Sequence, residues 1–140
     1  MTIYVETSAV LAWLFGEPEG TRVREALDRV ERVVSSVLTL VEAERAITRA
    51  QGQSLVTPAD AAGLRGLVAR STRHWTLLEI GPSVRRRAGQ AFPVEPMRTL
   101  DAVHLASALE LMMLFPDLAV LSLDDRISAN LGPLGLAREG

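Results

Sequence analysis

The chain has 140 residues, 48% of them hydrophobic, so a single domain over residues 1–140 with a core of its own is expected. It contains no cysteine, which excludes disulfide frameworks, thiolate metal sites and cysteine nucleophiles and favours a cytoplasmic protein. All 15 basic residues are arginine, which excludes lysine chemistry, and the net charge of −2 provides no overall basic field for nucleic acid.

The first half of the chain alternates strand and helix patterns. An apolar, β-favouring run over residues 2–5 precedes a helical segment over 8–15, and Gly16 and Pro18 end that pattern. A second helix is predicted over 19–31 and a short strand over 32–35. The serine that follows can cap a helix from 37 to about 50, in which apolar residues recur at helical spacing.

The second half begins with a strong helix-start signal, in which Thr57 is the cap, Pro58 opens the first turn and Asp60 lies three residues after the cap. Thr99 is a comparable cap for a later helix. In chain order, the elements predicted for this half are a helix over 58–70, a strand over 75–80, helices over 82–91 and 100–114, a strand over 118–123 and a helix over 126–131.

Strands that alternate with helices of ten or more residues need crossover connections, which favour a largely parallel sheet covered on both faces. We therefore expect a three-layer α/β/α domain. No run approaches the roughly 18 apolar residues that cross a bilayer, so no membrane segment is expected.

Acidic residues stand where such a fold places function. Glu6 and Asp124 each follow a predicted strand, Glu42 lies inside a predicted helix and Asp101 lies in the first turn of another. Functional groups of open parallel sheets gather at the carboxyl ends of the strands. Carboxylates brought together repel each other unless a cation neutralises them, and hard oxygen ligands favour magnesium or manganese. A phosphodiester cleaved with metal assistance is the natural substrate.

Each acid also has a simpler interpretation. Glu6 could be an exposed strand end and Glu42 a solvated helix residue. Asp101 and Asp124 could stabilise helix N-termini, where acids are favoured regardless of function. The occurrence of all four together supports the metal site.

Four segments resemble the motifs of PIN-domain ribonucleases, most closely those of the VapC toxins of bacterial toxin-antitoxin pairs. The resemblance covers residues 3–136, with the four motifs in the same order as in the family. The acids at Glu6, Glu42, Asp101 and Asp124 resemble the acids of those motifs. The four segments are IYVETSAVLAWLFGEPEG at 3–20, SSVLTLVEAERAITRA at 35–50, MRTLDAVHLASALEL at 97–111 and VLSLDDRISANLGPLGL at 120–136.

The resemblance implies a PIN-like sheet of about five strands in the order 3-2-1-4-5. It implies a catalytic set of Glu6, Glu42, Asp101 and Asp124, with Mg²⁺ or Mn²⁺ held by Glu6, Asp101 and Asp124. It further implies endonucleolytic cleavage of a structured RNA such as transfer or ribosomal RNA, a homodimer, and a small VapB-like antitoxin that blocks the cleft.

Glu6 departs from the family pattern, which usually has aspartate at this position. The extra methylene displaces the carboxylate by about 1.5 Å, a large shift against the roughly 2.0 to 2.1 Å range of magnesium ligands. Either the longer side chain reaches the ion through another rotamer, or the change silences the enzyme. A non-catalytic PIN domain that binds RNA or a partner protein is therefore the alternative function.

Other residues of the motifs have supporting roles or simpler ones. Ser8 and Ser122 could donate hydrogen bonds to the acids, although Thr7 and Ser8 could instead cap a helix and Ser122 could be an ordinary strand residue. Asp125 either joins the site or only caps a helix. Arg98 could contact RNA or the antitoxin, or pair with a carboxylate.

Three further features carry hypotheses. His104, one turn beyond Asp101, is predicted to be a half-buried core histidine rather than a ligand or general base. The basic run over 85–87 could contact phosphate but fits ordinary solvated arginines. The apolar excess at Leu11 and over 13–15 suggests an interface with a second copy or with the antitoxin.

Competing enzymes with this type of sheet are excluded by composition. Receiver domains and haloacid-dehalogenase-type phosphatases are families that rely on a lysine near their acids. This chain has no lysine. The second group also expects an Asp-x-Asp pair where this chain has Glu6, Thr7 and Ser8.

Overall fold

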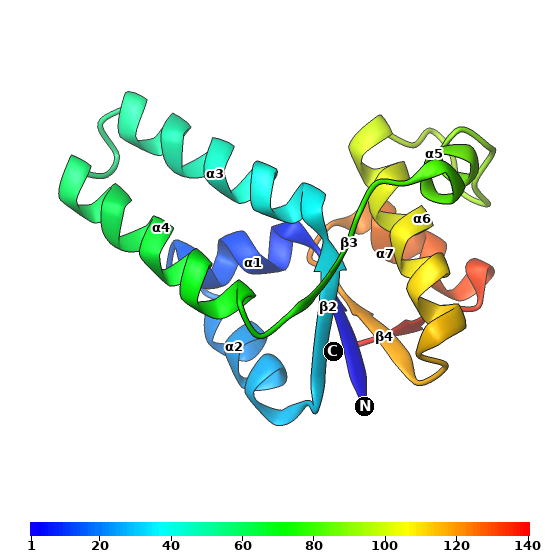
Figure 1. Cartoon of the computed structure of the whole chain (residues 1–140). Helices are drawn as coiled ribbons and strands as arrows, with labels where there is room; N and C mark the ends of the chain where they lie inside the picture. Colours follow the sequence, from blue (N-terminus) through cyan, green and yellow to red (C-terminus); the bar gives the residue numbers. More distant parts are fainter.

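Five parallel strands form one sheet in the order β3-β2-β1-β4-β5 in the computed structural model, which describes all residues from 1 to 140 (Figure 1). The predicted three-layer fold and strand order are confirmed. The strands are β1 (Thr2–Val5), β2 (Arg32–Ser36), β3 (Thr76–Leu78), β4 (Leu118–Leu121) and β5 (Ala137–Arg138). The last strand was not among the predicted elements, because two residues are too few to show a pattern.

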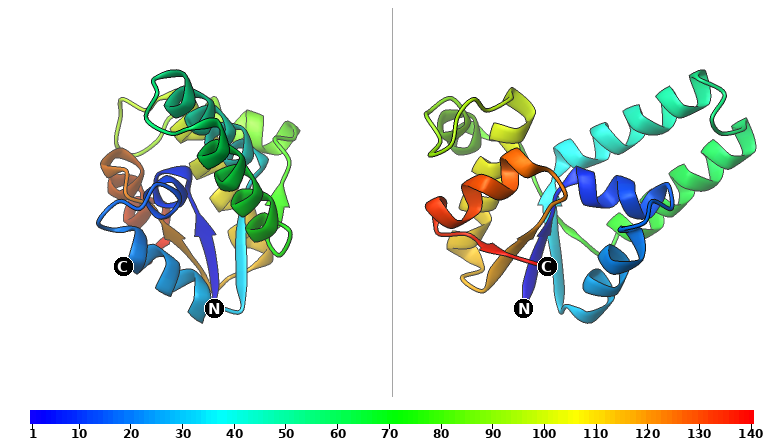
Figure 2. Two further views of the ribbon diagram at one scale, coloured as in Figure 1. Left: turned by 90° about the vertical axis from the view of Figure 1, so that its left-hand side faces the viewer. Right: turned by 180° about the vertical axis from the view of Figure 1, so that it is seen from behind.

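The sheet divides the helices into two groups (Figure 1). Helices α1 to α4 lie on one side and α5 to α7 on the other, and α3 and α4 form a hairpin that projects beyond the sheet (Figure 2). Their bounds are α1 (Thr7–Leu14), α2 (Gly20–Arg29), α3 (Val37–Gly52), α4 (Pro58–Thr72), α5 (Pro82–Ala88), α6 (Thr99–Leu114) and α7 (Asp125–Leu131), followed by a 3-10 turn at Gly132–Leu134. None of them is both long and apolar enough to cross a membrane.

Alternation along the central strand β1 builds a separate core on each face. Tyr4 points into a cluster with residues of α6 and α7, whereas Ile3 and Val5 join the cluster under α1 and α2. Successive side chains of a strand point to opposite faces, so one four-residue strand contributes to both layers. All four residues of β1 are buried. The first strand therefore determines where its carboxyl end, and Glu6 after it, can lie.

Helix caps agree with the sequence at two places and differ at two others. Ser36 caps α3 and Thr57 forms a capping box with Asp60, as predicted. Neither Thr7 nor Ser8 caps α1, because the side chain of the preceding Glu6 does so. Thr99 is not the cap of α6 either, since that position belongs to Arg98 and no side chain caps the helix. Both corrections concern the candidate site.

The apolar excess of α1 has an explanation within the fold. Trp13 packs partly buried against the cluster of β1 and α2. Leu14 belongs to the cluster between α3 and α4, and Leu11 and Phe15 pack against it. A helix that contacts two cores needs apolar residues on two faces, so the excess by itself requires no external partner.

We predict that Gly20→Ala destabilises the protein, because a Cβ there would lie 2.5 Å from the carbonyl oxygen of Ala12 in the neighbouring helix. Such overpacking costs about 1–3 kcal/mol. Gly63→Ala is the matched control, since it lies in α4 with nothing within 4 Å of the new Cβ and should gain roughly 0.5–1 kcal/mol of helix stability. Urea denaturation of both variants measures the difference, and equal effects would contradict the close packing of α1 and α2.

Candidate active site

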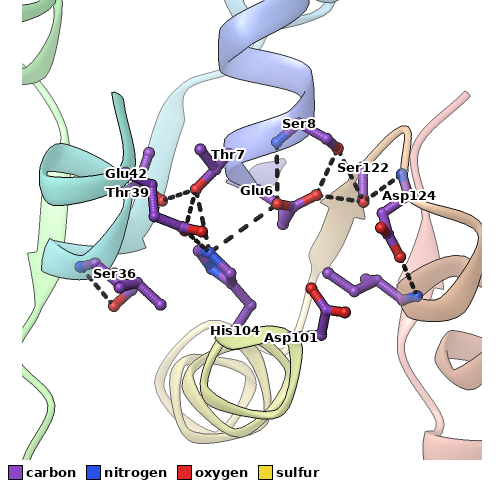
Figure 3. Close-up of polar contacts among 12 residues, drawn as sticks. Glu6, Thr7, Ser8, Ser36, Thr39, Glu42, Asp101, His104, Ser122 and Asp124 are labelled. Atoms are coloured by element: carbon purple, nitrogen blue, oxygen red, sulfur yellow. Dashed lines mark hydrogen bonds and ion pairs between the residues drawn. The ribbon is translucent and has the colours of Figure 1, made fainter. Parts of the chain in front are cut away.

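The four predicted acids lie at one end of the sheet, although they come from four separate segments (Figure 3). Glu6 follows β1, Asp124 follows β4, Glu42 lies in the second turn of α3 and Asp101 in the first turn of α6. Parallel strands put their carboxyl ends at the same edge. The chain termini lie at the opposite edge (Figure 2).

Glu6 is buried, with 5% of its surface exposed, so the interpretation as an exposed strand end is wrong. Its Oε2 accepts a hydrogen bond from the backbone N–H of Ser8 at 2.9 Å. Its Oε1 accepts from the hydroxyls of Ser8 at 2.5 Å and of Ser122 at 2.6 Å. A buried carboxylate costs little when its lone pairs are filled by donors, and here both oxygens are engaged by this chain's own groups.

Glu42 is held from the inside of the molecule. Its Oε1 accepts from the Thr7 hydroxyl at 2.6 Å and lies 2.6 Å from Nε2 of His104. Burial raises the pKa of this carboxyl, but the hydrogen bonds from His104 and Thr7 together lower it by more than burial raises it. The pKa of Glu42 therefore lies below its usual value. Glu42 is therefore ionised at neutral pH while a quarter of its side chain, 25%, stays exposed.

His104 is buried with 2% exposure, so the prediction of a half-buried histidine is corrected. Its Nδ1 lies 2.7 Å from the hydroxyl of Tyr4, and its Nε2 also lies 3.1 Å from Thr7 and 4.0 Å from Glu6 (Figure 3). Burial and the charge of Glu6 raise the pKa of Tyr4 well above its usual value, so the phenol keeps its proton. The histidine thus joins the central strand to two of the acids.

Arg98 occupies the space between the other two acids. Its Nε donates to Asp101 at 2.7 Å and its Nη2 donates to Asp124 at 2.8 Å. Hydrogen bonding to Asp101, with the charges of both carboxylates, raises the pKa of the guanidinium. Asp124 also caps α7 by accepting from the N–H of Ile127. Of the two interpretations left open for Arg98, the structure therefore shows the carboxylate partner.

Asp125 stays apart from this cluster. It is exposed, stands at the first residue of α7 and has no side-chain hydrogen bond or ion pair. Arg85 and Arg87 also lie outside, since their guanidinium groups donate to the backbone carbonyls of Ile80 and Ala91.

The donors at this end of the sheet suit a hard divalent cation, and Arg98 marks a place that accepts positive charge. Carboxylate oxygens are the ligands that magnesium and manganese prefer. No three acidic or histidine side chains converge on one point, because Arg98 lies between Asp101 and Asp124 and serine donors hold Glu6. Asp101 and Asp124, with Glu6 beside them, could hold such an ion once Arg98, which is 58% exposed, turns away.

A groove of about 370 Å³ is lined by residues of α1 and α3, and Glu42 is one of them. Its walls include the apolar Leu38, Val41 and Leu100, together with Arg45 and Arg49. Both arginines are exposed. The groove therefore combines positive charge with an ionised carboxylate in its wall.

Sequence reasoning missed two parts of this site. It assigned no role to Tyr4 or Thr39, although Tyr4 contacts His104 across 100 residues and Thr39 lies 3.2 Å from the Thr7 hydroxyl. A single polar atom in an apolar strand, such as the Tyr4 hydroxyl, was the available signal, because a buried hydroxyl requires a partner.

Comparison with known proteins agrees with this geometry. The family model described as PIN domain matches residues 3–130. The chain is 36% identical to Ribonuclease VapC35 of Mycobacterium tuberculosis over 137 residues, covering 96% of this chain and 93% of that protein. It is 37% identical to Ribonuclease VapC46 of the same organism over 136 residues, with 96% and 94% covered.

Two solved structures are similar in fold. One is VapBC2 from Rickettsia felis bound to a DNA fragment from their promoter, with a TM-score of 0.68, 10% identity, and 99% of this chain and 98% of that chain covered. The other is DNA-bound VapBC from Salmonella typhimurium, with a TM-score of 0.63, 18% identity, and 99% and 97% covered.

We predict that Ser122→Ala destabilises the protein by about 1–3 kcal/mol, because it removes one of the two hydroxyl donors to Oε1 of the buried Glu6 and leaves only Ser8 there. Ser83→Ala, on the exposed face of α5, is the control and should change stability by less than about 0.5 kcal/mol. Chemical denaturation measures both. An equal, small effect would mean that Glu6 does not depend on this hydroxyl.

Proposed function

This chain belongs to the PIN-domain family, and from that premise we propose that it is a VapC ribonuclease toxin. In this proposal it is a Mg²⁺- or Mn²⁺-dependent endoribonuclease that cleaves a structured RNA such as transfer or ribosomal RNA. The observation that carries the proposal is the gathering of Glu6, Glu42, Asp101 and Asp124 at one end of the sheet (Figure 3). The relatives named Ribonuclease support the same reaction class.

Asp101, Asp124 and Glu6 would hold the metal ion. When bound, a divalent cation supplies charge neutralisation and Lewis acidity at the scissile phosphate. Glu42 is ionised and partly exposed, so it can accept a proton from an attacking water. Arg98, on leaving the two aspartates, becomes a free guanidinium for a phosphate.

The groove beside Glu42 supports RNA as the substrate. Arg45 and Arg49 line it and can neutralise phosphates locally, although the net charge of the chain is −2. Leu38, Val41 and Leu100 add apolar area for a base or for an apolar protein segment. In this proposal RNA binds to a local basic surface and does not depend on a net positive charge of the whole protein.

Two protein partners complete the proposal, a VapB-like antitoxin and a second copy of the chain. The similar solved structures are named as VapBC assemblies, which supports the antitoxin. Exposed apolar residues at the end of α6, with Met113 83% and Leu114 67% exposed, provide area for protein contact.

A non-catalytic PIN domain is the second candidate function, and Glu6 is the feature that favours it. Both oxygens of Glu6 are engaged by serine donors. If those bonds hold the carboxylate away from a metal ion, the domain binds RNA or a partner without cutting it.

Cleavage of a total RNA pool with magnesium or manganese distinguishes the two candidates, with fragment ends mapped by sequencing. We expect discrete, metal-dependent cuts by the unmodified chain and their loss, by at least about a hundredfold, in Asp101→Asn, because a neutral amide is a weaker ligand. Asp28→Asn on the exposed surface of α2 is the control.

Glu6→Asp completes that comparison. Cuts by this variant alone would identify the chain as a silenced form, and equal rates would exclude silencing by Glu6. If no version cleaves any RNA, the catalytic proposal is wrong and the binding function stands.

We predict that Arg98→Gln binds Mn²⁺ several-fold more tightly than the unmodified chain, because it removes the cation that now contacts Asp101 and Asp124. Isothermal titration calorimetry measures the affinity without RNA. Arg126→Gln, an exposed arginine of α7, is the control. Weaker binding by the Arg98 variant would mean that the guanidinium holds the aspartates ready instead of competing with the ion.

A further inference from the structure

We propose that His104, oriented by Tyr4, is a positioning residue that holds Glu42 in place for RNA cleavage. This inference rests on the proposed ribonuclease function and concerns how its partly exposed carboxylate is kept in one orientation. It assigns a purpose to a buried polar pair that the metal site does not use.

The imidazole is fixed on both sides. His104 is 2% exposed, and both of its ring nitrogens have partners, Tyr4 at 2.7 Å and Glu42 at 2.6 Å. The Tyr4 and His104 rings also pack edge to face, with centroids 6.0 Å apart at 77°. Rotating the ring would leave two buried polar groups without partners, which is costly.

The protons in this chain of contacts can be assigned from chemistry. The ionised Glu42 carboxylate can only accept a hydrogen bond, so Nε2 of His104 carries the proton that it donates. With its hydrogen on Nε2, the imidazole can accept at Nδ1 the hydrogen bond that the Tyr4 hydroxyl donates. The Tyr4 hydroxyl thereby favours the tautomer that carries its hydrogen on Nε2, where it faces Glu42.

The two oxygens of Glu42 are treated differently by the protein. Oε1 receives both inner donors, the Thr7 hydroxyl and His104 Nε2, each at 2.6 Å. Oε2 has no hydrogen-bond partner in the chain, and the side chain is 25% exposed. One oxygen is therefore anchored in the protein while the other is available to a water or to the substrate.

Thr7 cannot hold Glu42 alone. Its hydroxyl has a single proton, which goes to Glu42, and the same oxygen lies 3.2 Å from Thr39. One donor lets a carboxylate swing about that contact, whereas a second donor from another helix, α6, restricts it. Orientation of a general base contributes strongly to its effect on the rate.

Two amide substitutions of His104 separate positioning from packing. The amide nitrogen of His104→Gln can reach the place of Nε2 and donate to Glu42, whereas the shorter amide of His104→Asn reaches only the place of Nδ1, beside Tyr4. Both remove the ring from the core. We expect similar losses of thermal stability, but kcat within a few-fold of normal for His104→Gln and about ten- to a hundredfold lower for His104→Asn, with KM unchanged.

Tyr4→Phe keeps the ring of His104 and removes only the donor to Nδ1. We expect kcat to fall several-fold with KM unchanged. Ser83→Ala is the unaffected control. Equal activity of the two amide variants at equal folded fractions would overturn the proposal, since packing alone would then account for His104.

Nitrogen-15 NMR of the imidazole tests the same inference without RNA. The unmodified chain should show a protonated Nε2 and an unprotonated Nδ1, with Glu42→Gln altering mainly the Nε2 signal and Tyr4→Phe mainly the Nδ1 signal. The opposite tautomer, or a ring that averages between both, would overturn the proposal. Absence of cleavage by the unmodified chain would instead refute the ribonuclease function. The NMR measurement would then still test whether His104 and Tyr4 orient Glu42.

Discussion

Two serine hydroxyls and one guanidinium neutralise or solvate three carboxylates at the carboxyl end of the sheet. Glu6 and Asp101 are each less than 10% exposed, at 5% and 8%, and a buried charge without partners would be strongly destabilising. Ser8 and Ser122 fill the oxygens of Glu6, and Arg98 pairs with Asp101 and Asp124. The loops after β1 and β4 and the start of α6 must therefore stay close together.

Hydrogen bonds of buried polar side chains also connect the site to the core. Tyr4 lies in the middle of β1, packs into the cluster under α6 and α7, and reaches His104 with its hydroxyl. His104 in turn reaches Glu42 on α3, which lies on the other side of the sheet (Figure 3). His104 thus joins both helical layers, so a displacement of α6 or α3 would disturb its contact with Glu42.

The arginines near the site fall into two groups, one paired with the acids and one exposed along the groove. Arg98 is paired with Asp101 and Asp124, whereas Arg45 and Arg49 are exposed along the groove that Glu42 also lines. This separation suits a protein that must bind a polyanion while its own acids repel it. Exposed arginines attract phosphate, and the guanidinium of Arg98 offsets negative charge at Asp101 and Asp124.

The amino-acid sequence by itself determined the alternation of strands and helices, the caps at Ser36 and Thr57, and the positions of the four acids, because these depend on local patterns and on motif resemblance. It did not reveal β5, which has only two residues, or that Glu6 rather than Thr7 or Ser8 caps α1. Only the tertiary structure decided that His104 contacts Tyr4 and Glu42 and that Arg98 bridges two aspartates. Those contacts join residues up to 100 positions apart, and the fold alone brings them within hydrogen-bond distance.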